Sequence, residues 1–191
     1  MKKLLNPIEF YNDRKLLIAN LIIFVVGTAL AVLMKAWFSN NFSVMFRTDL
    51  NAYKTITENI IAILITAFVF FIAGKIVNKK TRLIDCFNLS FVIRIPSYIL
   101  SLTNIIDTHS RNFLEIDKDG SISFSSSLSS TDIIILNITQ ILNIIVIIYF
   151  IVLIYQSFKT ISNSKKASHF LILVILIIIS IIITTTLFKN L

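Results

Sequence analysis

Residues 133–155 read IIILNITQILNIIVIIYFIVLIY, a run without a single charged side chain. A helix of about 20 apolar residues is as long as the hydrocarbon core of a bilayer is thick. Four further apolar segments of similar length lie at residues 16–38, 56–77, 84–106 and 170–188. Only helices or closed barrels satisfy every backbone amide in lipid, and these segments are much longer than barrel strands. The sequence therefore predicts an all-α, polytopic membrane bundle of five transmembrane helices.

The composition agrees with a membrane protein. Charged residues make up 15% of the chain, whereas a soluble domain has about 25%. No linker of appreciable length separates the apolar segments, so we expect residues 1–191 to form a single membrane domain. Within it, residues 1–15 are expected to be a basic cytoplasmic N-terminus and residues 107–132 an outer loop.

The region before the first span carries its own signals. Asn6-Pro7 is typical of a helix start, and apolar residues among residues 8–11 favour a short interfacial helix. A simple basic tail is the alternative. A cleaved signal peptide ending at residues 29–31 is also conceivable, but Glu9 precedes the apolar run and the run continues beyond this site. We therefore expect the first helix to be retained.

The distribution of basic residues predicts the orientation. Eleven Lys and Arg residues fall on the side of the N-terminus, whereas six fall on the other side. The eleven are Lys2, Lys3, Arg14, Lys15, Lys75, Lys79, Lys80, Arg82, Lys159, Lys165 and Lys166. Because positive loops remain cytoplasmic, we expect a multi-pass protein of the cytoplasmic (inner) membrane with its N-terminus inside and its C-terminus outside.

Several function classes find no support in the sequence. The net charge of +8 comes from the basic inner face, and most phenylalanines lie in or beside spans, so nucleic-acid binding is not expected. Cys86, His109 and His169 lack the spacing of a zinc site. No nucleotide-binding glycine loop, HExxH or GxSxG motif occurs. We expect no catalytic residue, metal ion or cofactor. The expected partners are membrane lipids, with other membrane proteins or a second copy of the chain as further possibilities.

The third apolar segment is unusually polar. Asp85, Asn88, Arg94 and Pro96 fall within twelve residues of it. If the segment enters from the inside at residue 84, Arg94 lies about 15 Å deep, near the bilayer midplane. An unpaired arginine there costs about 3 kcal/mol or more, so its side chain should face protein or water. Pro96 cannot donate to the carbonyl four residues earlier, so we expect a kink or break.

The fourth segment offers polar groups at a similar depth. Asn137, Gln140 and Asn143 recur at intervals of three and form a polar stripe whose amide oxygens are expected to solvate Arg94. This intramembrane polar cluster has three readings: a structural knot that fixes helix register, a pathway for a solute or proton, or a third segment that is broken and partly re-entrant. Glu58, near the outer end of the second span, either stays hydrated or pairs with a buried cation.

The outer loop has the pattern of a β-hairpin. Polar and apolar residues alternate over residues 112–125, and Asp119-Gly120 supplies turn chemistry. Glu115, Asp117 and Asp119 also resemble the first half of a calcium-binding EF-hand loop. Ser126 stands where the bidentate glutamate belongs, so the plain hairpin is favoured.

Short motifs spread along the chain resemble the bacterial branch of the Yip (Ypt-interacting protein) domain family. They are GKIVNKKTR at residues 74–82, Ile84-Asp85, Arg94-Ile95-Pro96, NPIEFY at residues 6–11 and YQSFK at residues 155–159. The resemblance implies five spans with an inner N-terminus and an outer C-terminus, and it brings no catalytic residues.

The resemblance also limits what is transferred from the family. Eukaryotic relatives act in vesicle traffic and contact Rab-type GTPases through an acidic-tyrosine-glycine-proline stretch. This chain has no such stretch, so GTPase binding is not expected. The sequence favours a non-enzymatic protein that organises the membrane or its partner proteins. The alternative is a small-solute transporter or channel that uses Arg94 and its polar neighbours.

Overall fold

The computed structural model is an all-α bundle with two short pairs of strands. It describes residues 2–38, 44–46, 51–103, 114–116, 122–124, 130–164, 166 and 168–189. Among these, five helical stretches are long and apolar enough to cross a membrane: Asp13–Leu33, Ala52–Val77, Leu83–Ser101, Asn137–Ser162 and Ser168–Phe188. The prediction of an all-α membrane bundle with five spans is confirmed.

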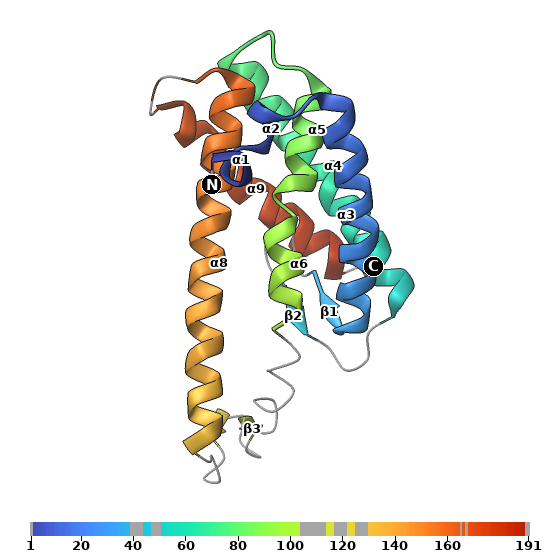
Figure 1. The fold of residues 1–191 in the computed structure, drawn as a ribbon, viewed down its shortest axis with the longest axis vertical. Coiled ribbons are helices and arrows are strands. Elements are labelled where there is room, and N and C mark those ends of the chain that lie inside the picture. Colours follow the sequence, from blue (N-terminus) through green and yellow to red (C-terminus); the bar gives the residue numbers. More distant parts are fainter. Residues whose placement is uncertain are drawn as a thin grey trace.

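The chain runs alternately down and up through the bundle (Figure 1). Helices α1 (Lys2–Leu5) and α2 (Pro7–Phe10) lead into α3 (Asp13–Leu33), which is followed by α4 (Ala52–Val77). The third span consists of α5 (Leu83–Val92) and α6 (Ile95–Ser101), and the last two spans are α8 (Ser130–Ser162) and α9 (Ser168–Lys189). In Figure 1, α6 continues downward from α5 rather than turning back, and α9 slants behind the other helices.

The first span is shorter at its C-terminal end than the apolar run suggests. Helix α3 begins after Asn12, whose side chain accepts from the Arg14 backbone N–H at 3.1 Å, and it ends at Leu33 rather than at residue 38. Lys35 has a φ of 52°, which turns the chain into strand β1 (Ala36–Trp37). This strand pairs antiparallel with β2 (Met45–Phe46). The two-strand unit lies at the lower end of the bundle beside α6 (Figure 1).

A second strand pair lies between the third and fourth spans. Strand β3 (Leu114–Ile116) pairs antiparallel with β4 (Ile122–Phe124), with Glu115 opposite Ser123. This pairing occurs inside the segment for which the sequence predicts a hairpin. The residues on which the turn and the EF-hand comparison depend, Asp117, Asp119, Gly120 and Ser126, lie outside the described residues.

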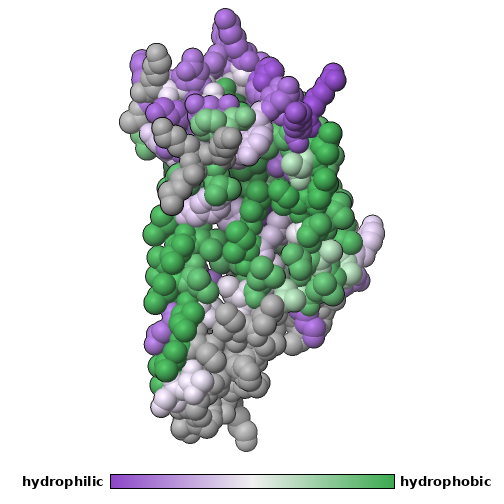
Figure 2. All heavy atoms as spheres, in the orientation of Figure 1, coloured by the Kyte–Doolittle hydropathy of each residue, from purple (hydrophilic) through white to green (hydrophobic). Residues whose placement is uncertain are grey.

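The larger of two apolar clusters within the described residues joins several of the spans. It contains Leu89 of α5, Phe70 of α4, Leu153 and Phe158 of α8 and Leu173 of α9, which are fully or almost fully buried. Many large apolar residues of the spans are exposed, as expected of a lipid-facing surface. Figure 2 shows this apolar surface in green, with hydrophilic residues in purple gathered at the upper end.

Candidate functional site

Arg94 sits at the break between α5 and α6. Ile93 and Arg94 form the turn, in which the Arg94 N–H donates to the Phe91 carbonyl at 3.0 Å, a tighter pattern than that of an α-helix. Pro96 occupies the first turn of α6 and has no N–H to offer the carbonyl of Val92, so the α-helical ladder is interrupted here. The expected break at Pro96 is therefore present, and Arg94 is only 2% exposed.

Asn59 of α4 is the main hydrogen-bond partner of Arg94 among the described contacts. Its Oδ1 accepts from Arg94 Nε at 2.7 Å. Its Nδ2 donates to Thr28 Oγ1 of α3 at 2.7 Å and to Tyr98 Oη of α6 at 2.8 Å. Asn59 is fully buried, and these three bonds use both hydrogens of its amide and its oxygen. One side chain thus ties together three of the five spans.

Glu58 and two aromatic residues complete the site. Glu58 is fully buried, and its Oε1 accepts from Trp37 Nε1 at 3.0 Å. Arg94 interacts electrostatically with Glu58 and Tyr98 and lies over the ring of Phe38, with its Cζ 4.2 Å from the ring centroid. Of the two readings of Glu58, the hydrated one is wrong, because the side chain is fully buried and accepts from Trp37 of β1. We call Thr28, Trp37, Phe38, Glu58, Asn59, Arg94 and Tyr98 the Arg94 cluster.

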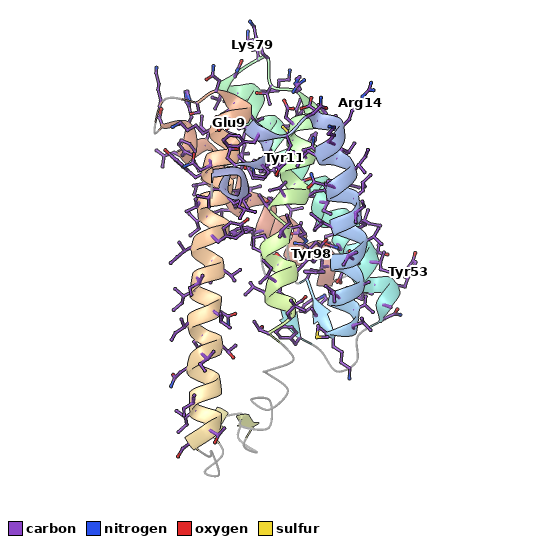
Figure 3. All side chains as sticks on the ribbon, in the orientation of Figure 1. Glu9, Tyr11, Arg14, Tyr53, Lys79 and Tyr98 are labelled. Carbon is purple, nitrogen blue, oxygen red and sulfur yellow. The ribbon has the colours of Figure 1, made fainter. Side chains whose placement is uncertain are left out.

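A glycine on α3 makes room for the cluster. The ring of Tyr98 lies so close to Gly27 that a β-carbon there would overlap it. Tyr98 is 5% exposed and also packs edge-on against Phe38, with ring centroids 6.2 Å apart. Figure 3 shows Tyr98 between α6 and α3. The close approach of these helices at Gly27 positions the Tyr98 hydroxyl to meet Asn59.

Two of the sequence-predicted residues belong to other contacts. Asn88 is buried one and a half turns before Arg94 and accepts from Asn20 Nδ2 at 3.1 Å, which joins α5 to α3. Asp85 lies at the start of α5 and binds Arg82 through both oxygens, at 2.7 and 2.9 Å. The hydrogen bond and charge of Asp85 raise the pKa of Arg82 above its ordinary value. Neither residue is part of the Arg94 cluster.

The polar stripe of the fourth span does not meet Arg94 in the described structure. Asn137 and Gln140 are exposed on α8, and Asn143 is half-buried. No hydrogen bond within the described residues joins any of these amides to Arg94. The expectation that these amides solvate the guanidinium is therefore corrected. Asn59 of the second span accepts the hydrogen bond from Arg94 instead. The physical reason is that α4 packs most extensively against α5 and brings Asn59 to Arg94, whereas α8 contacts α5 and α6 without bringing its amides to the guanidinium.

Sequence reasoning missed Asn20, Thr28, Asn59, Tyr98 and Trp37. A usable signal was present for Asn59, because an amide inside an apolar run needs a partner and Glu58 stands beside it. Which residue of another helix becomes the hydrogen-bond partner of Asn59 depends on how the helices pack and tilt. The position of a polar residue within an apolar run does not reveal that packing. The sequence places Trp37 at the end of the first span. A helix that continued to residue 38 would give no reason to expect a contact between Trp37 and Glu58.

The arrangement gives the cluster limited chemistry. A guanidinium, a carboxylate, an amide and two hydroxyls meet within the membrane-spanning part, bound by short hydrogen bonds and capped by aromatic rings. Within the part of the chain that the structure describes, no group of three or more His, Cys, Asp and Glu side chains stands together as metal ligands would. The cluster is suited to hold helices in register or to stabilise a charge inside the membrane.

Comparison with known proteins identifies a family. The sequence model described as the Yip1 domain matches residues 5–187, which is nearly the whole chain. The match includes all of the residues of the Arg94 cluster. No curated protein sequence and no solved structure matches the chain significantly.

Proposed function

This chain belongs to the Yip1 domain family of multi-pass membrane proteins, and we propose that it is a non-enzymatic organiser of membrane proteins. The observation that carries the proposal is the exposure of Asn137 and Gln140 on α8. These amides stand on a loosely packed surface of the bundle. Only 17% of the apolar window of α8 is buried, compared with 61% for the α5–α6 span. A partner helix that covers this face would satisfy both amides.

The chemistry of the amides supports a protein partner. Asn and Gln side chains donate and accept hydrogen bonds between membrane helices, worth about 0.6 to 2 kcal/mol each. Their neighbours Ile138, Ile141 and Ile144 are exposed and apolar, so they add packing surface beside the polar groups. A second copy of the chain would present the same donors and acceptors, and so would another membrane helix that carries a polar side chain.

Cysteine cross-linking at the proposed contact face tests the organising role. Cys86 is buried, so Asn137→Cys introduces a reactive thiol on the exposed face of α8 in native membranes. We expect an oxidant-dependent product, at twice the mass of the chain for a second copy or at another mass for a different partner. Asn137→Leu combined with Gln140→Leu should reduce co-purification of that partner. The matched control, Ile138→Leu with Ile141→Leu, should not. A chain that remains monomeric under all conditions contradicts the proposal.

The sidedness is part of the proposal. The hydrophilic end in Figure 2 carries Lys79 and Arg14, both labelled at the upper end of Figure 3. This agrees with an N-terminus in the cytoplasm, an outer C-terminus and a location in the inner membrane. Lipids of the inner leaflet would then surround the basic end of the bundle.

A second candidate function rests on the Arg94 cluster. Arg94 and Glu58 are almost fully buried charged side chains within the membrane-spanning part, and such residues often mark ion or solute pathways. If the protein conducts a small anion, Arg94→Leu should leave it folded and abundant but abolish chloride or phosphate flux in vesicles that contain the purified protein. If the cluster is structural, the same variant should lose abundance in the membrane.

A further inference from the structure

A cavity of about 200 Å³ extends from the hydrophilic end of the bundle to the α5–α6 break, and no residue of the Arg94 cluster lines it. The N-terminal segment lines one side of it through Leu4, Pro7 and Tyr11, and α3, the α5–α6 break and α8 form its other sides. Leu16, Ala19 and Ile23 of α3 supply apolar lining, and Val92 and Ile95 face them from either side of the break. Nothing in the proposed organising role assigns an occupant to this space.

The cavity has a charged mouth and an apolar floor. Lys15 and Tyr11 line it at the hydrophilic end of the molecule, where both are exposed. From Lys15 to Ile23 the helix rises about 12 Å, and the lining changes from cationic to aliphatic over that length. Arg14, also exposed, adds a second cation at the same end. A complementary ligand has an anionic head and a hydrocarbon tail.

Hydrogen bonds hold the walls of the cavity in place. Asn20 is 2% exposed, lines the cavity and donates to Asn88 at 3.1 Å, which fixes α3 against α5. Tyr149 of α8 also lines it, and its hydroxyl donates to the Leu4 carbonyl at 3.1 Å. Asn6 donates to Thr160 at 2.7 Å. These contacts keep the N-terminal segment across α8, so the site is formed before a ligand arrives, as most ligand sites are.

We propose that this cavity binds one acyl chain of an anionic phospholipid of the inner leaflet, with its phosphate at Lys15. The apolar walls give water few hydrogen-bond partners, whereas an acyl chain fills the space with favourable contacts. Each lysine near an anionic membrane surface contributes about a fivefold preference for anionic lipid. The N-terminal segment then acts as a strap over a bound lipid. This inference requires only that the chain resides in the membrane, and it does not depend on a protein partner at α8.

Photolabelling of the intact protein tests the site. The protein is placed in vesicles of phosphatidylethanolamine and phosphatidylglycerol that contain a trace of phosphatidylglycerol with a diazirine at the end of one acyl chain. We expect labelled peptides to include residues 19–23 and 92–95 in preference to the exposed face of α9. Ala19→Trp fills the cavity and should remove this labelling. The matched control is Ala29→Trp, which adds the same bulk to an exposed alanine near the other end of α3.

The head group is tested separately. Lys15→Gln should lower labelling by the phosphatidylglycerol probe about fivefold, and labelling by a phosphatidylcholine probe should change little. Lys79→Gln removes a charge at the same end of the molecule but outside the cavity lining, and should leave both unchanged. Thermal unfolding followed by far-ultraviolet circular dichroism reports whether each variant remains folded. Labelling that persists in Ala19→Trp, or that is spread evenly over all lipid-facing helices, overturns the proposal. Cross-linking at α8 is unaffected by either result, so the two proposals fail independently.

Discussion

The ring of Tyr98 occupies the space in which any other residue at position 27 would place its β-carbon. This contact lets α6 approach α3 closely enough for the Tyr98 hydroxyl to accept from Asn59. Gly27 is one of only three glycines in the chain, so the close approach depends on a single position rather than on a repeated small-residue motif.

Gly27→Ala should therefore destabilise the protein, although alanine favours helices more than glycine does. We expect a loss of about 1–3 kcal/mol from overpacking against the ring. Thermal unfolding in detergent, followed by Trp37 emission, measures the loss. In a Tyr98→Leu background the same substitution should cost much less, because the ring is gone. Ala29→Leu, at an exposed position on the same helix, serves as the control and should be nearly neutral. Equal costs in both backgrounds would show that Tyr98 is not what Gly27 accommodates.

Asn59→Leu should have the largest effect among single amide substitutions in the spans. It removes the acceptor of Arg94 Nε and the donor to Thr28 and Tyr98, and it leaves a buried charge with fewer hydrogen bonds. Breaking a buried charged contact in this way costs about 3–5 kcal/mol. Combined with Arg94→Leu, the cost should fall below the sum of the two single effects by about 1–3 kcal/mol.

The amide control for this prediction lies on α8. Asn143→Leu should change stability little, because Asn143 has no hydrogen bond to Arg94 in the described structure. If the protein is selected for recovery of membrane abundance in an Arg94→Leu background, compensating changes should arise at Asn59 or Glu58. Recovery through Asn143 would instead place the polar stripe of α8 against Arg94.

The turn after α4 depends on a second tight contact. Thr81 Oγ1 donates to the Gly74 carbonyl at 3.0 Å, and a β-carbon at position 74 would lie 2.6 Å from Thr81 Cγ2. Gly74→Ala should therefore destabilise the turn by about 1–3 kcal/mol. In a Thr81→Ser background, which keeps the hydroxyl but removes Cγ2, the cost should largely disappear. Unfolding midpoints of the four proteins measure this coupling, and additive effects would contradict it.

Sidedness is open to a direct measurement. Lys79 and Tyr53 are both exposed and lie towards opposite ends of the bundle (Figure 3). In a Cys86→Ser background, Lys79→Cys should react with an impermeant maleimide only in inside-out vesicles. Tyr53→Cys should react only from the outside of intact cells. The reverse pattern would invert the predicted orientation, and labelling of both from one side would contradict the count of spans between them.

The sequence alone determined the medium, the class and the number of spans. Apolar runs of 19 to 23 residues leave lipid as the only solvent in which they are satisfied, and helices as the only structure that pairs their backbone groups. The break before Pro96 was equally predictable, because a missing N–H is a local property of the chain. The family resemblance, read from short motifs, agrees with the match over residues 5–187.

Only the tertiary structure decided which polar groups meet. Arg94 and Asn143 are predicted to lie at the same depth in the membrane, which suggests a contact between them. The packing of α4 against α5 instead places Asn59 beside Arg94. The turn at Lys35 places Trp37 within hydrogen-bond distance of Glu58. The absence of a side chain at Gly27 leaves room for the ring of Tyr98. A polar residue in an apolar run indicates that its side chain needs a hydrogen-bond partner. The identity of that partner depends on helix tilt, rotation and close approach, which arise from contacts between segments far apart in the sequence.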